Sequence, residues 1–419
     1  MIIYDNIHGY INIDNIASSI IDTSIFQRLR NIHQTGVLYL VFPTATHTRF
    51  EHSIGTYHLA KKLITNISNN QPELNITEEI INLVAIAGLC HDLGHLLFSH
   101  LFDDQFLSKL SNFDELKLKT NNTSHENRSI NLLNYLVETN NINLDKYQLK
   151  VIGDLINPKE SEYNKWKNKY QIGKWIFQII SNPVNSIDVD KFDYLTRDTQ
   201  SVGLKCGFDF NRIINDAKVI DNKICYSHQC SEDIYQMFFL RYRLHRQIYN
   251  HKAVKSIEIL VINLLFEFEK ELKISEYILD CEKMLELIDS FIWHNNINES
   301  IKKIINDINQ RKLPKLVYQD ISLYPIEYNE DKLKEFFNPN TYTILKFKVG
   351  YVGSKLNPLN YITFYNLKTG QVISDNNVRD FSLLLTQKHQ EHVIRIYCLD
   401  LSLVNEFNIY MNKNHSIKL

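Results

Sequence analysis

A histidine and an aspartate stand side by side at His91 and Asp92, at the end of the apolar run 80–89. Such a run is typical of a buried helix, whose interior has little use for two polar side chains without partners. A neutral imidazole beside a carboxylate can hold a divalent or transition-metal cation. His95 follows His91 by four residues, so we expect both rings on one helical face. Taken alone, the pair fits a hydrogen-bonded core pair equally well.

A second histidine of this kind is His52, three residues after Arg49 in the sequence PTATHTRFEHSIG. Pro43 and the threonines break structure, and a helix is expected from Arg49 to Ile64, so the two side chains can project together. His52 is a candidate metal ligand and Arg49 a candidate phosphate ligand. A histidine satisfied within the core is the alternative.

A third segment, residues 185–198, alternates carboxylates with apolar residues. Asp190, Tyr194 and Arg197 share helical spacing, as do Lys191, Tyr194 and Asp198, so one face can offer a metal carboxylate, a cation, a phenol and a second carboxylate. An amphipathic surface helix explains Lys191 and Arg197 well. It explains poorly the two aspartates that flank Val189.

A basic and aromatic stripe is expected on a long helix over residues 233–265. Arg241, His245 and Tyr249 repeat every four residues. Cations can meet phosphates and an aromatic ring can meet a base, which suits a nucleoside polyphosphate. A basic helix that contacts nucleic-acid phosphates is the alternative.

The elements that carry these residues are mainly helical. Helix starts are expected near Ser24, at Thr77 and at His125, while the Asn-rich residues 111–123 are expected to form a loop. Period-2 patterns predict strands at 342–349, 361–366, 371–374 and 392–399 around a short helix at 378–385. We therefore expect a mostly α-helical chain, with a core over residues 1–325 and a smaller α+β C-terminal lobe over 326–419.

Composition and charge limit the possible partners and the cellular compartment of the protein. The 419 residues carry a formal net charge of −2, so no global basic field indicates nucleic acid. The six cysteines contain no C-x-x-C pair, which fits a reducing compartment, and we expect an intracellular protein of the cytoplasm or nucleus. No apolar run approaches the roughly 20 residues of a membrane span, so no membrane partner is expected.

His52, His91, Asp92 and Asp190 together make the H…HD…D pattern of the HD-domain metal phosphohydrolases, which the chain resembles. The stretches FQRLR, VFPTATHTRFEHSIG, IAGLCHDLGHLLFSH, IDVDKFDYLTRD and LHRQIYNHK are similar to those of the SAM-and-HD-domain deoxynucleoside triphosphate (dNTP) triphosphohydrolases. The likeness covers nearly the whole chain, including RIYCLD near its C-terminal end. Several long motifs in one order are far more specific than a lone HD pair.

This resemblance implies a helical HD core and hydrolysis of a dNTP to deoxynucleoside and inorganic triphosphate through water attack at the α-phosphate. The four residues of the pattern would hold iron, manganese, zinc or magnesium. His100 would be the general acid, supported by Asp103 and His125. His95, Arg49, Lys191 and Arg241 would hold phosphates, Gln34 and Asp198 would read the sugar 3′-hydroxyl, and Tyr194, His245 and Tyr249 would pack around sugar and base.

The chain also departs from the family. It starts at the catalytic core, so we expect no SAM domain. Asp22, Gln27 and Arg30 match residues of a GTP or dGTP activator site, but Met1, Ser227 and Gln229 stand where cations are expected, which puts activation and the associated tetramer in doubt. Thr35 replaces a bulkier apolar residue beside Gln34 that helps exclude the ribose 2′-hydroxyl, so weaker rejection of ribonucleotides is expected.

Two other functions stay open at this point. One is an HD phosphohydrolase that acts on a nucleoside monophosphate or cyclic nucleotide, although the cations Arg49, Lys191 and Arg241 exceed what a single phosphate needs. The other is a nucleic-acid-binding protein with a vestigial site, which the complete ligand set and the near-neutral charge disfavour. The resemblance favours a homo-oligomer, dimer or tetramer. Base preference and metal identity are not set by the residues.

Overall fold

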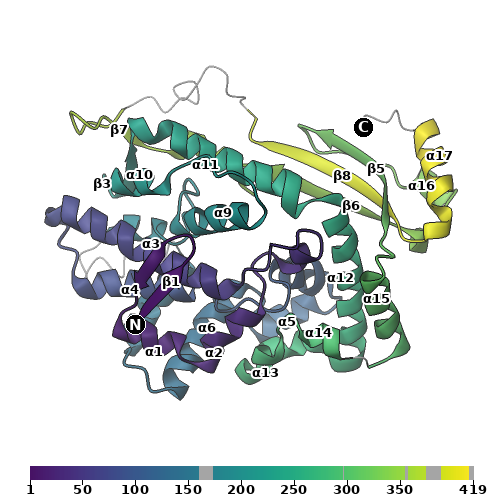
Figure 1. The fold of residues 1–419 in the computed structure, drawn as a ribbon, viewed down its shortest axis with the longest axis horizontal. Helices are drawn as coiled ribbons and strands as arrows, with labels where there is room; N and C mark the ends of the chain where they lie inside the picture. The colour runs from purple at the N-terminus through teal and green to yellow at the C-terminus, as the bar shows by residue number, and fades with distance from the viewer. Residues whose placement is uncertain (160–172, 296, 354–356, 374–387, 415–419) are drawn as a thin grey trace. The chain divides into compact units, whose positions relative to one another are not determined.

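The structure is a computed structural model that describes residues 1–159, 173–295, 297–353, 357–373 and 388–414 (Figure 1). The chain divides into two compact units that are interleaved along the sequence. The first comprises residues 1–240, 273–291 and 358–385, and the second comprises 241–272, 292–357 and 386–419. The division between a catalytic core and a lobe at residue 325 stays a prediction.

The first unit is built of helices. Its α-helices are α1 (Asn15–Ile21), α2 (Ser24–Gln27), α3 (Arg49–Asn70), α4 (Glu78–Cys90), α5 (Phe113–Lys119), α6 (His125–Thr139), α7 (Lys146–Ile156), α9 (Val189–Ser201), α10 (Phe210–Asn215) and α13 (Cys281–Glu286). Helix α11 (Ser231–Leu244) continues into the second unit, and α14 (Phe291–His294) begins at the boundary. Short helical turns of importance here are η2 (Gly36–Leu40) and the π-helical η4 (Leu101–Phe106).

Helices α3 and α4 start where the sequence indicates. The Glu51 carboxylate accepts a hydrogen bond from the backbone N–H of Thr48 (2.9 Å) at the start of α3, and the Thr77 hydroxyl accepts from Ile80 N–H (3.4 Å) at the start of α4. The two helices pack against each other, and α3 also packs against α9. Gly88 permits the close approach, because a Cβ there would lie 3.0 Å from the Thr56 carbonyl oxygen.

Small sheets complete the first unit. Strands β1 (Ile2–Asp5) and β2 (Gly9–Asn12) form an antiparallel hairpin, with Ile2 opposite Asn12. A three-stranded sheet has the order β3 (Lys218–Ile220), β4 (Lys223–Ser227), β7 (Phe364–Tyr365), with β4 and β7 parallel.

The second unit combines helices with an antiparallel sheet. Its helices are the π-helical η9 (His245–Tyr249), α12 (Lys252–Leu272), α15 (Glu299–Asn309), α16 (Asp331–Lys334) and α17 (Val404–Asn414). The sheet has the order β5 (Lys315–Ser322), β8 (Gln390–Cys398), β6 (Tyr342–Gly350). Helix α17 packs on β5, and buried Phe337, Phe407 and Met411 belong to the core beneath.

The prediction of a mostly α-helical chain with a smaller α+β part is confirmed. The strands predicted at 342–349 and 392–399 are β6 and β8, whereas 361–366 contains only the two residues of β7. Two predictions are wrong: residues 111–123 contain helix α5, and the long helix over 233–265 is divided into α11, η9 and α12. The helix predicted at 378–385 lies outside the described residues.

Among the helices that the structure describes, none is both long enough and apolar enough to cross a membrane.

Candidate functional site

The His-Asp pair lies in a turn at the C-terminal end of α4. The helix ends at Cys90, His91 is its cap, and the N–H of Leu93 donates to the Cys90 carbonyl (3.1 Å). The prediction that His91 and His95 share one helical face is therefore wrong, because the helix stops before both residues. The turn instead directs the two rings into different clusters.

The donor atoms of His52, His91 and Asp190 all lie within 4.8 Å of one another, and Asp92, the fourth predicted metal ligand, lies beside the two imidazoles. His52 Nε2 lies 3.3 Å from His91 Nε2, 3.1 Å from Asp190 Oδ1 and 3.4 Å from Asp92 Oδ2. His91 Nε2 lies 3.4 Å from Asp92 Oδ1. Atoms that each lie about 2.1 Å from one ion are roughly 3.0–3.4 Å apart in octahedral or tetrahedral coordination. The spacing of these donor atoms therefore fits a single cation.

Hydrogen bonds from the Nδ1 atoms orient the rings of His52 and His91 so that their Nε2 atoms face the proposed cation. His91 Nδ1 donates to the Gly88 carbonyl (2.8 Å), and His52 Nδ1 donates to Asp193 Oδ2 (2.8 Å). In neutral rings both Nε2 atoms then carry the lone pairs, and the two lone pairs face the same point. Two unprotonated nitrogens 3.3 Å apart repel each other, so a cation, either a proton on one ring or a metal ion between them, satisfies both.

Electrostatics at this point also favour a positive charge. Burial lowers the pKa of His52, but Asp190 and Asp193 outweigh it and raise the pKa to about 10. Burial acts against the charged form of His91 as well, and Asp92 and Asp190 raise its pKa. Carboxylates gathered around buried imidazoles stabilise whatever cation occupies the centre. The donor set therefore fits a divalent or transition-metal ion.

Asp193 is a functional residue that the sequence reasoning missed. It is fully buried and accepts hydrogen bonds from His52, from His8 Nε2 (2.7 Å) and from Arg197 Nε and Nη2 (2.9 Å each). Arg197 in turn pairs with Asp5 Oδ2 (2.9 Å). The i, i+4 spacing of Asp193 and Arg197 is the sequence signal that could have indicated this buried pair.

Arg49 is buried and lies against Asp92, one of the predicted metal ligands. Its guanidinium pairs with Asp92, donates from Nε to Ser99 Oγ (3.1 Å) and donates from Nη2 to the Gln34 carbonyl (3.2 Å). Gln34 Oε1 and the neighbouring Thr35 Oγ1 are buried and have no hydrogen-bond partner among the described residues. Buried polar atoms of this kind indicate a place for polar groups of a ligand.

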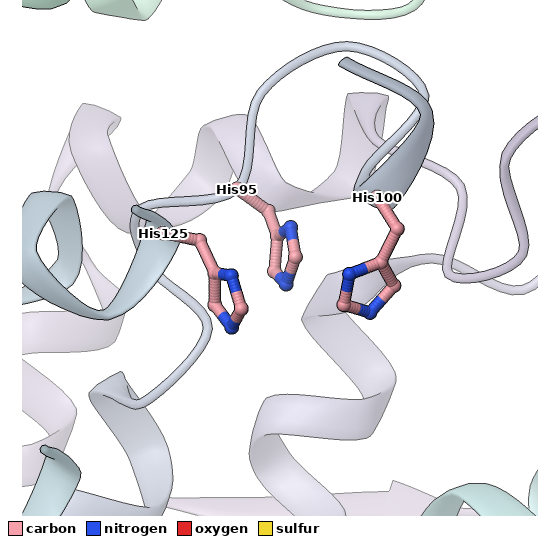
Figure 2. Close-up of side chains that lie close together, drawn as sticks. All are labelled: His95, His100 and His125. Atoms are coloured by element: carbon pink, nitrogen blue, oxygen red, sulfur yellow. The ribbon is translucent and has the colours of Figure 1, made fainter. Parts of the chain in front are cut away.

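His95, His100 and His125 form a second histidine cluster beside the first (Figure 2). The His95 and His125 rings stack with centroids 4.2 Å apart, and the His95 and His100 rings meet edge to face at 5.0 Å. Phe98 and Ser99, which precede His100, both have φ of +56°. Non-glycine residues rarely adopt this conformation, and such strain concentrates at functional sites.

Asp103 lies beside this cluster. Its carboxylate lies 3.6 Å from His125 Nδ1 and makes a two-oxygen pair with Arg128 Nη2 (2.7 and 2.8 Å). Arg128 is fully buried and also donates from Nε to the Gly94 carbonyl (2.7 Å), which fixes the turn before His95. The roles of these residues in catalysis stay predictions.

The remaining predicted substrate residues lie in both units. On α9, Lys191 Nζ pairs with Asp188 Oδ2 (2.9 Å), and Asp188 caps the helix, which explains the second carboxylate beside Val189. Asp198 Oδ1 bonds His47 Nε2 (2.7 Å), and Tyr194 is half-buried on the same helix.

Arg241, His245 and Tyr249 belong to the second unit. Arg241 Nη1 donates to the Gly350 carbonyl (2.7 Å), and the His245 and Tyr249 rings meet edge to face at 4.9 Å. Their contact with a substrate stays a prediction.

The predicted activator residues lie around the α1–α2 turn. Gln27 Nε2 donates to the Ile21 carbonyl (2.8 Å), Arg30 Nε donates to Gln27 Oε1 (2.8 Å), and the exposed Asp22 caps α1. The Arg30 guanidinium also lies 3.5 Å above the Phe50 ring. Activator binding at these residues stays a prediction.

Comparison with known proteins identifies the relatives of this chain. Residues 49–197 match the family described as "HD domain". The SAMHD1 homolog of Dictyostelium discoideum, a deoxynucleoside triphosphate triphosphohydrolase, is 36% identical over 95% of this chain and 77% of its own length. Human SAMHD1, of the same activity, is 32% identical over 95% of this chain and 70% of its own. A putative HD domain-containing protein of Acanthamoeba polyphaga mimivirus is 34% identical over 94% of this chain and 91% of its own length.

Proposed function

The chain belongs to the SAMHD1 family of HD-domain proteins, and on that premise we propose that it hydrolyses dNTPs to deoxynucleoside and inorganic triphosphate. The observation that carries the proposal is the convergence of His52, His91 and Asp190, with Asp92 3.4 Å from both imidazoles, next to a cluster of three further imidazoles. One cluster suits a cation and the other suits proton transfer, and phosphoester hydrolysis needs both.

The four converging residues would hold the cation. When bound, a divalent ion there supplies Lewis acidity that polarises a phosphate ester and activates water. Asp193 and the Gly88 carbonyl keep the two imidazoles in the orientation that this requires. Iron, manganese and zinc suit the mixed histidine and carboxylate set, and magnesium suits the substrate phosphates.

The side chains around the centre have separate tasks. Arg49 and Lys191 would pair with phosphate oxygens, and charge neutralisation of the departing triphosphate would lower the barrier. His100 would give a proton to the 5′-oxygen of the leaving deoxynucleoside, while Asp103 and His125 hold the proton-transfer network in place. Gln34 and Asp198 would contact the 3′-hydroxyl, and Tyr194 the sugar.

Product analysis tests this proposal. Purified protein is incubated with each dNTP and Mn²⁺ or Mg²⁺, and products are resolved by ion exchange. We expect deoxynucleoside and intact triphosphate, lost in a His91→Ala/Asp92→Ala variant and kept in an Asp114→Asn variant, whose side chain is 97% exposed. Release of a monophosphate with pyrophosphate, or of orthophosphate, would contradict the proposal.

We further propose a homo-oligomer, and the same incubation with and without GTP examines the activator residues. If Asp22, Gln27 and Arg30 bind a guanine nucleotide, GTP should raise turnover, and Arg30→Ala should remove that effect. Size-exclusion chromatography with light scattering, in the two conditions, measures whether the assembly changes with it. Unchanged turnover and mass would exclude the activator site.

A further inference from the structure

The cluster of His95, His100 and His125 has the donor set of a second metal site. Each residue offers one ring nitrogen, and these nitrogens all lie within 4.8 Å of one another. The residues come from three segments: the turn after α4, the residue before η4, and the first residue of α6. Figure 2 shows the three rings side by side, extending in the same direction from their backbones.

His95 provides the second, independent observation. Its side chain is fully buried, Nε2 lies 3.4 Å from Asp92 Oδ1, and Nδ1 has no hydrogen-bond partner among the described residues. A buried polar group left without a partner destabilises the folded protein. A ligand held by the three rings would give Nδ1 this partner, and the ring nitrogens of His100 and His125 lie close enough to share that ligand.

Carboxylates lie near two of the three rings. Asp103 is 3.6 Å from His125 Nδ1, and Asp104 Oδ2 is 3.9 Å from His100 Nδ1. A carboxylate behind an imidazole orients the ring and strengthens its opposite nitrogen as a metal ligand. The His100 side chain is 63% exposed, so a cation from solution can reach the cluster.

The ligand types in this cluster differ from those in the centre formed by His52, His91, Asp92 and Asp190. That centre contains two carboxylates, which suit harder ions. Three imidazoles and no carboxylate favour Zn²⁺, Cu²⁺ or Ni²⁺ over Mg²⁺. Three histidines with one open position is also an arrangement that zinc adopts in proteins.

We propose that His95, His100 and His125 form a second site for a transition-metal cation such as Zn²⁺, and that its occupation inhibits the hydrolysis of dNTPs. The inhibition rests on the proposed function: a ring nitrogen of His100 that holds a cation cannot give its proton to the leaving 5′-oxygen. The binding itself does not depend on that function.

Zinc stoichiometry tests the binding. Full-length protein is stripped of metal, equilibrated with Zn²⁺ by dialysis and analysed for metal content. We expect two zinc ions per chain, falling to one in His100→Gln and in His125→Ala. Asp190→Asn, which alters the other centre, should keep the ion at the three histidines. His294→Ala, at an exposed histidine elsewhere, serves as the matched control and should keep both. One zinc ion in the unaltered chain, or two in both cluster variants, would overturn the proposal.

A zinc titration of the Mn²⁺-activated protein tests the inhibition. dNTP turnover should fall in parallel with binding of the second zinc ion. A second ion bound without loss of turnover would overturn the inhibitory role. If no dNTP is hydrolysed under any condition, the proposed function fails, while the zinc count still decides whether the three histidines form a site.

Discussion

Gly55 is the position at which one added methyl group should disturb both stability and metal binding. It lies on α3 where that helix meets α9, and an alanine Cβ there would lie 1.9 Å from Asp193 Oδ1 and 2.6 Å from Arg197 Nη2. Side-chain Cβ atoms essentially never approach a heavy atom closer than 3.0 Å. In Gly55→Ala the Asp193 carboxylate must therefore move by roughly 1 Å, in an interior that has little free space.

The expected losses of stability and metal affinity follow from the contacts of Asp193. Overpacking of a well-packed interior costs about 1–3 kcal/mol, and breaking a buried ion pair costs about 3–5 kcal/mol. The two costs overlap because one displacement causes both, so we expect a loss of about 3 kcal/mol in the free energy of unfolding. Asp193 also orients His52, and loss of such a partner lowers metal affinity by about 10–100-fold.

Two measurements check this prediction. Urea unfolding of the metal-free proteins gives the stability change, and titration with Mn²⁺ gives the affinity change. Gly353→Ala is the matched control, since its Cβ would meet nothing within 4 Å. The reasoning is refuted if Gly55→Ala unfolds within about 0.5 kcal/mol of the unaltered protein, the range of ordinary surface substitutions, and binds Mn²⁺ equally well.

Three further predictions concern the surrounding residues. Thr35→Val removes a buried hydroxyl that has no partner among the described residues. If that hydroxyl bonds the ribose 2′-hydroxyl, its loss should lower the ratio of ATP to dATP turnover by roughly tenfold, because one hydrogen bond contributes about that factor. An unchanged ratio counts against a contact with the 2′-hydroxyl. Asp103→Asn leaves Arg128 buried without its counter-charge and should lower the free energy of unfolding by about 3 kcal/mol, measured in urea; a change below about 0.5 kcal/mol would contradict this. For Asp14, burial opposes ionisation, but the hydrogen bond from Lys61 outweighs it and holds the pKa below its ordinary value of 3.8. The stabilisation is thus present above that value and lost as pH falls below it, so Asp14→Asn should cost at most about 1 kcal/mol at pH 7 and less at pH 3; a cost that grows toward pH 3 would refute the assignment.

Much of the helical framework could be predicted from the sequence because its signals are local. A capping threonine or a glutamate in the first turn acts on the nearest backbone N–H groups, so the starts of α3 and α4 follow from Thr48, Glu51 and Thr77. Strands β6 and β8 alternate with period 2, and their pairing register of Tyr342 opposite Cys398 keeps that alternation.

Helix ends were predicted less well, because they depend on contacts made far along the chain. Helix α4 stops at Cys90, and the turn after it is held by Ser129, whose hydroxyl donates to the His91 carbonyl (2.6 Å) and accepts from Gly94 N–H (2.8 Å). The hydrophobic periodicity of residues 80–95 does not indicate these hydrogen bonds with Ser129. The same holds for the interruption at Asn250, whose side chain donates to the His245 carbonyl (2.8 Å).

The candidate metal ligands could be named from residue type and resemblance, and the structure groups the donor atoms of His52, His91 and Asp190, with Asp92 beside the two imidazoles. Asp193 could not be recognised in this way, because its role depends on the distance between α3 and α9. A single glycine, Gly55, permits that distance. Sequence spacing places Asp193 beside Arg197, but only the packed helices place it behind His52.

The most direct test of the central claim is hydrolysis of dATP by the metal-loaded protein in water enriched in ¹⁸O. Attack of water at the α-phosphorus predicts inorganic triphosphate that carries one ¹⁸O atom, together with unlabelled deoxyadenosine. The label and the products should both disappear in the His91→Ala/Asp92→Ala variant. Deoxyadenosine that carries the label, or dAMP with labelled or unlabelled pyrophosphate, would contradict the account.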